Sequence, residues 1–280
     1  MKWSLYIEAL EMQVQVETAN PFSLMGKRAL VTGGAMGIGM GIVRRFVDSG
    51  AKVLVADKVV GPAEKYISSL PENTRHSVSV MDVDLLDVEA SDLMMSEIVR
   101  DFGGIDILVN NAGIYPTVPM LDMSPELFDK VYHLNLRALA FASKAAAKQM
   151  IKQKTRGKIV NIASIDSIHP SSVGLAAYDA SKGGVLMFTK NFALEVAKSG
   201  ITVNAIAPGG IATEGTGMAG SGIPASDEIR KMLEEFRKQI PMGRMGTPDD
   251  IAKVAVFLSS SASDYMTGSL VVVDGGRLLM

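Results

Sequence analysis

The chain contains no cysteine, which excludes disulfides, thiolate catalysis and cysteine-ligated zinc or iron–sulfur sites. Its three histidines, His76, His133 and His169, do not stand at metal-ligand spacing, so we expect no metal site. Neither sign of charge is in excess, because 28 Lys and Arg stand against 30 Asp and Glu, and no basic run suggests a nucleic-acid partner. No apolar run approaches the roughly 18 residues of a membrane-spanning helix. We therefore expect no membrane partner and, by default, a cytoplasmic protein.

The first 25 residues differ in character from the rest of the chain. Glu8, Glu11 and Glu17 interrupt the apolar positions, and there is neither a long apolar stretch nor a small-residue cleavage site of the kind a signal peptide needs. We interpret residues 1–25 as an N-terminal extension, either an incidental addition or an arm that packs on a neighbouring subunit. Residues 26–280 are expected to form one domain, since no low-complexity linker divides them.

From Arg28 onward, short apolar runs alternate with longer stretches of helical apolar spacing. The strand-like runs are 29–31, 52–56, 77–81, 105–109, 158–162, 202–206 and 269–273. The clearest helical stretches are 38–47, 91–102, 125–150 and 176–198. Such alternation is typical of βαβ units, and near-continuous apolar strands indicate helices on both faces of the sheet. The sequence predicts an α/β fold with one doubly wound, seven-stranded, mostly parallel sheet, whose ligands bind beyond the carboxyl ends of the strands.

A glycine-rich stretch joins the first expected strand to the first expected helix. Gly33, Gly37 and Gly39 would allow a tight turn, a close approach to a pyrophosphate and close packing of helix on sheet. Amides at the start of the following helix favour phosphate charge. A plain turn is the simpler alternative, but the position within a βαβ unit favours a nucleotide. No Gly-Lys-Ser/Thr follows, so the stretch is not a Walker A loop.

An acidic residue, Asp57, closes the second expected strand. A carboxylate there accepts hydrogen bonds from both hydroxyls of an adenosine ribose and repels a 2′-phosphate. The place beside the glycines where a basic residue would favour that phosphate holds Met36. Lys58 is the one residue here whose charge would favour a 2′-phosphate, and we expect its side chain to point to solvent. These residues predict NAD in preference to NADP.

Tyr178 and Lys182 stand four residues apart near the start of a long expected helix, so they share one face of it. A tyrosine, whose free pKa is about 10, is a poor base unless a nearby positive charge stabilises the phenolate. A lysine ammonium and an oxidised nicotinamide ring both provide that charge, and Ser164 after the fifth strand could hold a substrate oxygen. Alone, this spacing occurs on many surface helices. Together with the glycine loop and the serine, it predicts proton transfer beside a hydride carrier.

With these motifs in order, the chain resembles the short-chain dehydrogenase/reductase family from about residue 26 to residue 276. The motifs that carry the resemblance are Thr32-Gly33…Gly37-Ile38-Gly39, Asn110-Asn111-Ala112-Gly113, His133-Leu-Asn135-Leu, Asn161-Ile-Ala-Ser164, Tyr178-Asp-Ala-Ser-Lys182 and Pro208-Gly209…Thr213. The resemblance implies a Rossmann-type domain and an NAD(P)-dependent oxidoreductase. It assigns the family's catalytic set to Asn135, Ser164, Tyr178 and Lys182.

The resemblance also implies roles within that set. Tyr178 would be the acid/base, Ser164 would polarise the carbonyl, Lys182 would hold the ribose and lower the tyrosine pKa, and Asn135 would anchor a water in a proton relay. The resemblance also implies contacts with the dinucleotide: Asp82 and Val83 would contact the adenine, Asn110 and Ala112 the ribose, and Ile211 and Thr213 the nicotinamide carboxamide. The full expected cofactor set is Gly33, Met36, Gly37, Ile38, Gly39, Asp57, Asp82, Val83, Asn110, Ala112, Tyr178, Lys182, Pro208, Gly209, Ile211 and Thr213.

Two departures from the family pattern concern the serine. Ser164 and Tyr178 are separated by one residue more than is usual, which we interpret as an insertion between them. Ala163 stands where many members have a second serine, so Ser167 is an alternative for the serine role. Tyr115 and His169 are weaker candidates for contacts with the substrate.

Residues 210–241 are the least regular part of the sequence and contain four closely spaced glycines, Gly215, Gly217, Gly220 and Gly222. We interpret 210–241 as a lid over the substrate, with a disordered insert as the alternative.

The sequence as a whole predicts an oxidoreductase that transfers hydride between NAD and a secondary alcohol or ketone, such as a sugar, a polyol or another small hydroxy compound. A 3-oxoacyl-carrier-protein reductase is the alternative, and a protein that uses the fold without chemistry is a third. Alanine-rich apolar helices, together with the resemblance, predict a homotetramer.

Overall fold

The computed structural model describes residues 20–213 and 234–280. Most of the expected N-terminal extension (residues 1–19) and most of the expected lid (residues 214–233) lie outside the described residues. Among the described residues, no helix combines the length and the apolar character needed to cross a membrane.

Seven parallel strands form one sheet in the described part of the chain, in the order β3-β2-β1-β4-β5-β6-β7. The strands are β1 (Arg28–Thr32), β2 (Lys52–Asp57), β3 (Val78–Asp82), β4 (Ile107–Asn110), β5 (Lys158–Ile162), β6 (Thr202–Pro208) and β7 (Leu270–Val273). This confirms the predicted doubly wound sheet. Because every strand runs in the same direction, all their carboxyl ends meet at one edge.

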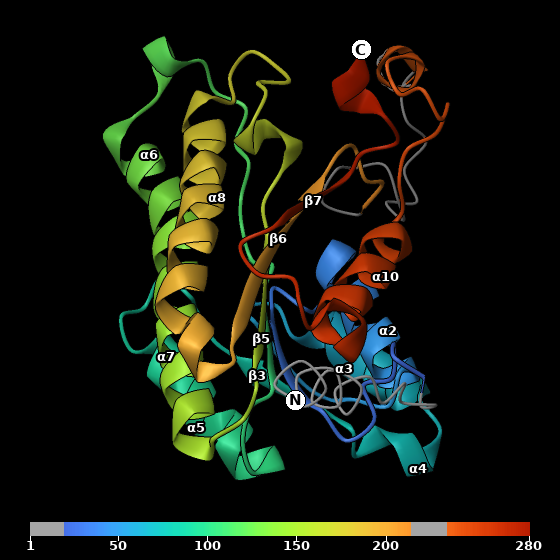
Figure 1. Ribbon diagram of the computed structural model, residues 1–280. Helices are drawn as coiled ribbons and strands as arrows, with labels where there is room; N and C mark the ends of the chain where they lie inside the picture. The colour runs from blue at the N-terminus through green and yellow to red at the C-terminus, as the bar shows by residue number, and fades with distance from the viewer. Residues whose placement is uncertain (1–19, 214–233) are drawn as a thin grey trace, which may run out of the picture.

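Helices cover both faces of the sheet (Figure 1). On one face lie α2 (Gly37–Asp48), α3 (Gly61–Ser69) and α10 (Pro248–Ser259). On the other lie α5 (Ala90–Phe102), α6 (Pro125–Tyr132), α7 (Leu139–Gln153) and α8 (Ala176–Val196). Shorter turns are α4 (Glu72–Arg75) and the 3₁₀ segments Met120–Asp122, Ile165–Ser167, Ala197–Ser199, Ser261–Ser263 and Arg277–Leu279.

Strand β1 shows why its apolar run is continuous. Ala29 and Val31 are fully buried in a cluster with α2 and α10, whereas Leu30 is fully buried in a second cluster with α5 and α7. A strand covered by helices on both faces needs apolar side chains at every position rather than at alternate ones. The strand therefore lies in the middle of two apolar layers.

The helix predicted over 125–150 has three parts. Ser124 caps α6 by accepting a hydrogen bond from the Leu127 amide at 3.2 Å. A π-helical segment, His133–Ala138, follows, and α7 continues from it to Gln153. Within the π segment, each backbone hydrogen bond joins residues five apart, whereas in an α-helix it joins residues four apart. The segment carries Asn135, which is fully buried.

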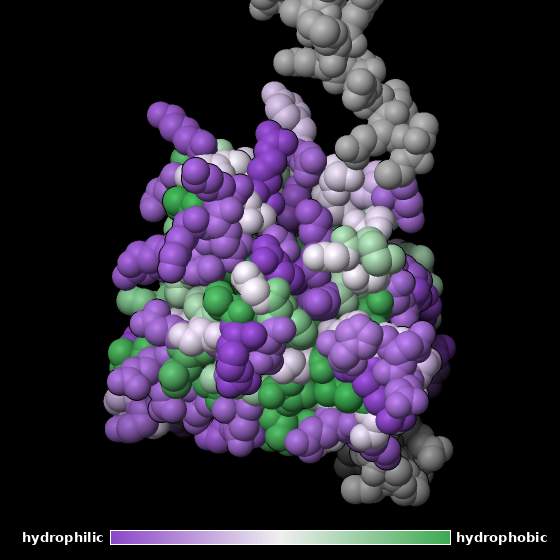
Figure 2. Space-filling model, turned by 90° about the horizontal axis from the view of Figure 1, so that it is seen from below, coloured by the Kyte–Doolittle hydropathy of each residue, from purple (hydrophilic) through white to green (hydrophobic). Residues whose placement is uncertain are grey.

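Helix α8 begins at the upper end of the molecule in Figure 1, so Tyr178 in its first turn belongs to that end. Figure 2 looks at the molecule from below, and the surface there is mainly hydrophilic with smaller hydrophobic areas between. The loops that follow the carboxyl ends of the strands lie at the upper end, beside the start of α8.

Candidate active site

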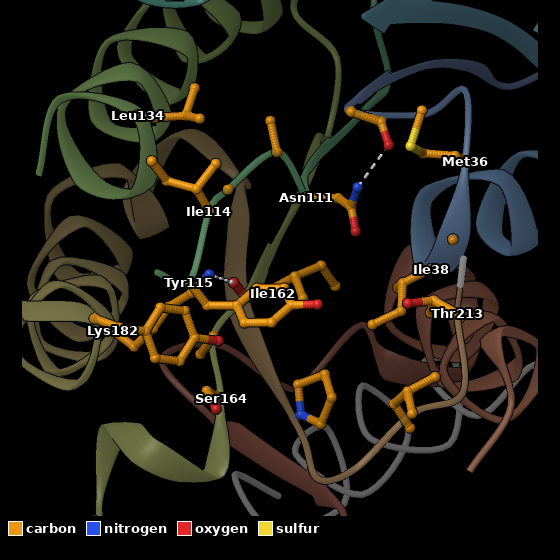
Figure 3. Close-up of a pocket in the computed structure, with 18 of the residues that line it drawn as sticks. Met36, Ile38, Asn111, Ile114, Tyr115, Leu134, Ile162, Ser164, Lys182 and Thr213 are labelled. Atoms are coloured by element: carbon orange, nitrogen blue, oxygen red, sulfur yellow. Dashed lines mark hydrogen bonds between the residues drawn. The ribbon is translucent and has the colours of Figure 1, made fainter. Parts of the chain in front are cut away.

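A cavity of about 650 Å³ lies at the carboxyl edge of the sheet. Its walls come from the loops that follow six strands, β1 to β6 (Figure 3). Ser164, Tyr115 and Lys182 lie on one side of the close-up, and Met36, Ile38 and Thr213 lie on the other, with Asn111 and Ile162 between them. The predicted catalytic and cofactor residues that line it are Gly33, Met36, Gly37, Ile38, Asp57, Val83, Ala112, Ser164, Tyr178, Lys182, Pro208, Gly209, Ile211 and Thr213.

The β1–α2 loop and the first turn of α2 each contain a glycine with no room for a side chain. Gly33 has a φ of +60°, and a β-carbon there would lie 2.9 Å from the Cα of Ala112. A β-carbon at Gly39 would lie 2.0 Å from the Gly33 carbonyl oxygen. Helix α2 begins at Gly37, so its positive end faces this part of the cavity. The loop could therefore hold a phosphate group at the start of α2. Gly39 supports it from outside the cavity lining.

The Asp57 carboxylate is held at the end of β2 by two backbone amides. Its Oδ2 accepts a hydrogen bond from Ala35 at 3.0 Å, and its Oδ1 accepts one from Val59 at 3.1 Å. Lys58 also lines the cavity and forms an ion pair with Asp84, with most of its own side chain exposed. The exposed Asp82, by contrast, does not line the cavity, although Val83 does.

Two neighbouring asparagines after β4 face different ways. Asn111 lines the cavity and donates from Nδ2 to the Gly33 carbonyl at 2.8 Å and to the Thr32 carbonyl at 3.1 Å. Asn110 is buried beneath it and donates from Nδ2 to Ser143 Oγ and Asn161 Oδ1. Asn111 therefore fixes the glycine loop. Asn111 lies within a family motif, but the sequence alone predicted no role for it.

Lys182 and Tyr178 lie on one face of α8 and both reach the cavity. The buried Lys182 ammonium donates to the carbonyl of Ile162 at 2.7 Å and lies 5.7 Å from the centre of the Tyr178 ring. Ser164 follows β5 and reaches the same part of the cavity. The structure thus brings together three of the four predicted catalytic residues.

Burial governs the acid–base properties of this pair. Burial raises the pKa of Tyr178 to about 12, a hydrogen bond with Ser164 acts in the opposite direction, and the negative charges of Asp166 and Asp179 add to the increase. Burial also lowers the pKa of Lys182 to about 8. In the protein alone, Tyr178 therefore holds its proton. It becomes a base only when further positive charge arrives beside it.

Asn135 does not line the cavity. Its Nδ2 donates to the Ile114 carbonyl at 2.9 Å and to Ser181 Oγ at 3.0 Å, and its Oδ1 accepts from the Ile114 amide at 2.8 Å. Ser181 in turn donates to the Tyr178 carbonyl at 2.7 Å. Asn135 therefore joins the loop after β4 to the first turn of α8. Its role in a water relay stays a prediction.

The turn after β5 distinguishes the two candidate serines. Ser164 lines the cavity and Ser167 does not. Ser167 Oγ instead accepts a hydrogen bond from the Ser164 amide at 3.3 Å and so helps to form the turn. Ser164 Oγ donates to Asp166 Oδ2 at 2.9 Å, and Asp166 itself lines the cavity. Sequence reasoning did not single out Asp166, because no motif marks that position.

The two weak substrate candidates are placed differently. The Tyr115 ring lines the cavity and meets the Tyr178 ring edge to face, with centroids 6.2 Å apart. His169 is exposed and is not among the cavity-lining residues, so its contact with substrate stays a prediction. Phe236 and Met245 close the described part of the wall near Gly210. Across residues 20–213 and 234–280, no three His, Asp or Glu side chains gather as a metal site would require.

Comparison with known proteins identifies the family. A family model described as enoyl-(acyl carrier protein) reductase matches residues 33–277. A 2-dehydro-3-deoxy-D-gluconate 5-dehydrogenase of Dickeya dadantii is 39% identical over 259 residues, covering 92% of this chain and 98% of the relative. The chain belongs to the short-chain dehydrogenase/reductase family. As a member, it is an NAD(P)-dependent oxidoreductase that acts on CH–OH groups.

Other relatives of this short-chain dehydrogenase/reductase differ in their named substrates. A galactitol 2-dehydrogenase of Agrobacterium fabrum is 35% identical, and a 3-oxoacyl-[acyl-carrier-protein] reductase of Chlamydia pneumoniae is 38% identical; each match covers 91% of this chain and 98% of the relative. Among solved structures, one from Agrobacterium tumefaciens with bound NADP, named for a proposed 2-deoxy-D-gluconate 3-dehydrogenase activity, superposes with a TM-score of 0.81. It is 38% identical and the match covers 94% of this chain and 100% of that one.

Proposed function

We propose that this enzyme transfers hydride between NAD(H) and a secondary alcohol or ketone of a sugar, a polyol or another small hydroxy compound. The observation that carries the proposal is one cavity shared by two sets of residues. The glycine loop and Asp57 form one end, and Ser164, Tyr178 and Lys182 meet at the other. The first end suits a dinucleotide, because Gly33 and Gly37 line it without side chains and α2 begins at Gly37 with its positive end toward the cavity.

When bound, the oxidised dinucleotide supplies the hydride acceptor and a positive charge beside Tyr178. With its pKa lowered by that charge, Tyr178 would release its own proton to solvent, and the phenolate Oη would then take the proton from the substrate hydroxyl. Ser164 Oγ lies on the same side and orients the substrate oxygen. Lys182, held by the Ile162 carbonyl, keeps positive charge next to the phenolate and is placed to bind the nicotinamide ribose.

We propose NAD as the preferred dinucleotide. The Asp57 carboxylate, fixed by the Ala35 and Val59 amides, stands where it accepts ribose hydroxyls and repels a 2′-phosphate. Met36 supplies no positive charge there, and Lys58 is paired with Asp84. The NADP bound to the Agrobacterium tumefaciens relative makes the ratio of kcat/KM for the two cofactors the decisive measurement. We further propose a cytoplasmic location, where the free dinucleotide is available.

The proposed reaction is tested with purified protein, NAD or NADP, and a panel of sugars, polyols and simple secondary alcohols, followed by NADH absorbance. We expect NAD-dependent oxidation of a member of the panel. Reduction of a 3-oxoacyl thioester with NADPH, without polyol oxidation, would instead favour the carrier-protein reductase suggested by the Chlamydia pneumoniae relative.

Tyr178→Phe removes the transferable proton and keeps the ring. We expect kcat to fall on the order of 10²-fold or more, because the general acid/base is lost. NADH binding, measured by fluorescence, should remain within about twofold. Tyr132→Phe, on α6 and stacked on Phe128 outside the cavity, is the matched control and should keep wild-type kcat. A Tyr178→Phe enzyme with more than about a tenth of wild-type kcat would contradict the proposed role.

A further inference from the structure

One carboxylate lines the part of the cavity beside the reacting centre, and a second lies close behind it, outside the lining. Asp166 lines the cavity in the turn after Ser164, and its Oδ2 accepts the hydrogen bond from Ser164 Oγ at 2.9 Å. Its Oδ1 is enclosed and has no hydrogen-bond partner among the described residues. Asp179, the residue after Tyr178, does not line the cavity, and its enclosed Oδ1 likewise lacks a partner in the part of the chain that the structure describes. Buried carboxylate oxygens without donors are uncommon, because each keeps a charge that neither water nor protein compensates.

No basic side chain in the described part of the chain pairs with either carboxylate. Neither Asp166 nor Asp179 takes part in any of the ion pairs found there. Lys182, the nearest ammonium in the catalytic group, donates to the Ile162 carbonyl instead.

The other basic side chains of the cavity lie toward its other end. Lys58 pairs with Asp84, and the charge of Lys130 also acts on Asp84, in the loop after β3. The described charges of the cavity are therefore unevenly distributed. Lys58 and Asp84 form an ion pair toward the cofactor end, whereas Asp166 at the substrate end has no basic partner among the described residues.

Two titrating groups respond to this negative charge. Burial and the charge of Asp166 together raise the pKa of Asp179 to about 6. The charges of Asp166 and Asp179 both contribute to the raised pKa of Tyr178. Both carboxylates therefore act on Tyr178, the residue proposed to exchange the proton, and Asp166 does so from the cavity wall where the substrate must bind.

We propose that Asp166 selects the substrate by charge: the enzyme accepts neutral polyhydroxy compounds and protonated amino alcohols, and rejects compounds that carry a carboxylate or phosphate near the reacting carbon. The inference rests on the proposed oxidation of a secondary alcohol by Tyr178 and refines its substrate class. An anion beside an unpaired carboxylate in a poorly solvated cavity is repelled more strongly than in water. A hydroxyl group carries no charge to be repelled, and an ammonium group is attracted.

The proposed selection by charge divides the relatives according to the charge of the substrates for which they are named. The Dickeya dadantii enzyme is named for a gluconate derivative, which carries a carboxylate, whereas the Agrobacterium fabrum enzyme is named for galactitol, a neutral polyol. The substrate of this chain would then share the charge class of galactitol, although overall identity is slightly higher to the gluconate-type enzyme.

Three probes of one carbon skeleton test the inference: galactitol, galactonate and 1-amino-1-deoxygalactitol. With NAD and wild-type enzyme, we expect kcat/KM for galactonate to be at least tenfold below that for the other two. Asp166→Asn, which keeps the shape and removes the charge, should raise the value for galactonate about tenfold relative to galactitol. It should lower the value for the amine. Asp122→Asn, an exposed acid outside the cavity lining, is the charge-matched control and should leave all three ratios unchanged.

Binding is measured separately from turnover by calorimetry, using the NAD complex of Tyr178→Phe with and without Asp166→Asn. We expect galactonate to bind at least tenfold more weakly than galactitol unless Asp166 is replaced. Charge selection in binding without turnover by the wild type would support the role of Asp166 and refute the proposed reaction. Turnover in which galactonate equals galactitol, or ratios that Asp166→Asn leaves unchanged, would overturn the role of Asp166 and leave the reaction standing.

Discussion

Asp179 has the clearest consequence for stability among the single residues of the site. Its pKa rises from 3.8 to about 6 on folding, through burial and then the charge of Asp166, so the folded protein favours the protonated acid. That contribution to stability is fully present below about pH 4 and is lost as the pH rises through about 6. At neutral pH, Asp179 therefore destabilises the fold.

We predict that Asp179→Asn raises the melting temperature on the order of a few degrees at about pH 8, with a much smaller gain near pH 4. Calorimetry or circular dichroism across that range measures the effect. Asp122→Asn, an exposed acid, is the control and should show no such pH-dependent gain. A gain of equal size at both ends of the range would mean that the charge of Asp179 is not the cause.

The β1–α2 loop and the end of β2 act as one element. Asp57 Oδ2 accepts the Ala35 amide, and Asn111 from the loop after β4 holds the Gly33 carbonyl. Asp57, which we expect to bind the ribose hydroxyls, thus also supports the β1–α2 loop. Replacing it should change both cofactor choice and overall cofactor affinity.

We predict that Asp57→Ala weakens NAD, raising its KM about tenfold, and shifts the NAD/NADP ratio of kcat/KM toward NADP by a similar factor or more. Steady-state kinetics with each cofactor give the ratio. Asp87→Ala, exposed and outside the cavity lining, serves as the control. Equal losses for both cofactors would assign Asp57 to loop support alone.

The strands were predictable from sequence because both faces of the sheet are covered, so their apolar runs are short and nearly unbroken. Helix α10 was missed although it has a signal, since Thr247 and Asp250 form a capping box around Pro248. The π segment around Asn135 has no such signal, because its apolar spacing continues that of the helices on either side. The pattern therefore predicted one long helix.

At the site, motifs predicted the residues whose chemistry repeats across a family, such as Tyr178 and Lys182. Asp166 was missed because its significance depends on its burial and on the absence of a basic partner among the described residues. The spacing of residues in the sequence predicts neither property. The same holds for Asn111, whose amide reaches a carbonyl far away in the sequence. Packing determines which segments far apart in the sequence come into contact, so these contacts could not be predicted before the fold was known.

At the scale of the whole molecule, we propose a homotetramer. Helices α7 and α8 cover the sheet with one face, yet they expose Phe141, Ile151, Met187 and Leu194 on the other. Leu194 is 78% exposed and Met187 61%. Apolar side chains of this size on two neighbouring helices are typical of a surface that a second copy covers.

We predict a mass near four chains by light scattering at micromolar concentration. The double variant Met187→Glu/Leu194→Glu should reduce that mass to two chains or one, since it puts four negative charges into each two-copy interface that this surface forms. Val88→Glu, equally exposed but before α5, is the control and should keep the tetramer. A wild-type protein that is monomeric and active would refute the proposal.

The order of the strands also bears on how the chain is made on the ribosome. Strand β1 is near the N-terminus but lies in the middle of the sheet, with β2 on one edge and β4 on the other. Its pairing with β4 joins Ala29 to Ile107 and Thr32 to Asn110. A nascent chain can thus form β1, β2 and β3 early, but one edge of β1 stays without a partner until residue 110 has left the exit tunnel. During that interval an apolar central strand presents open backbone groups to other chains, so the first 110 residues are open to wrong pairing until β4 arrives.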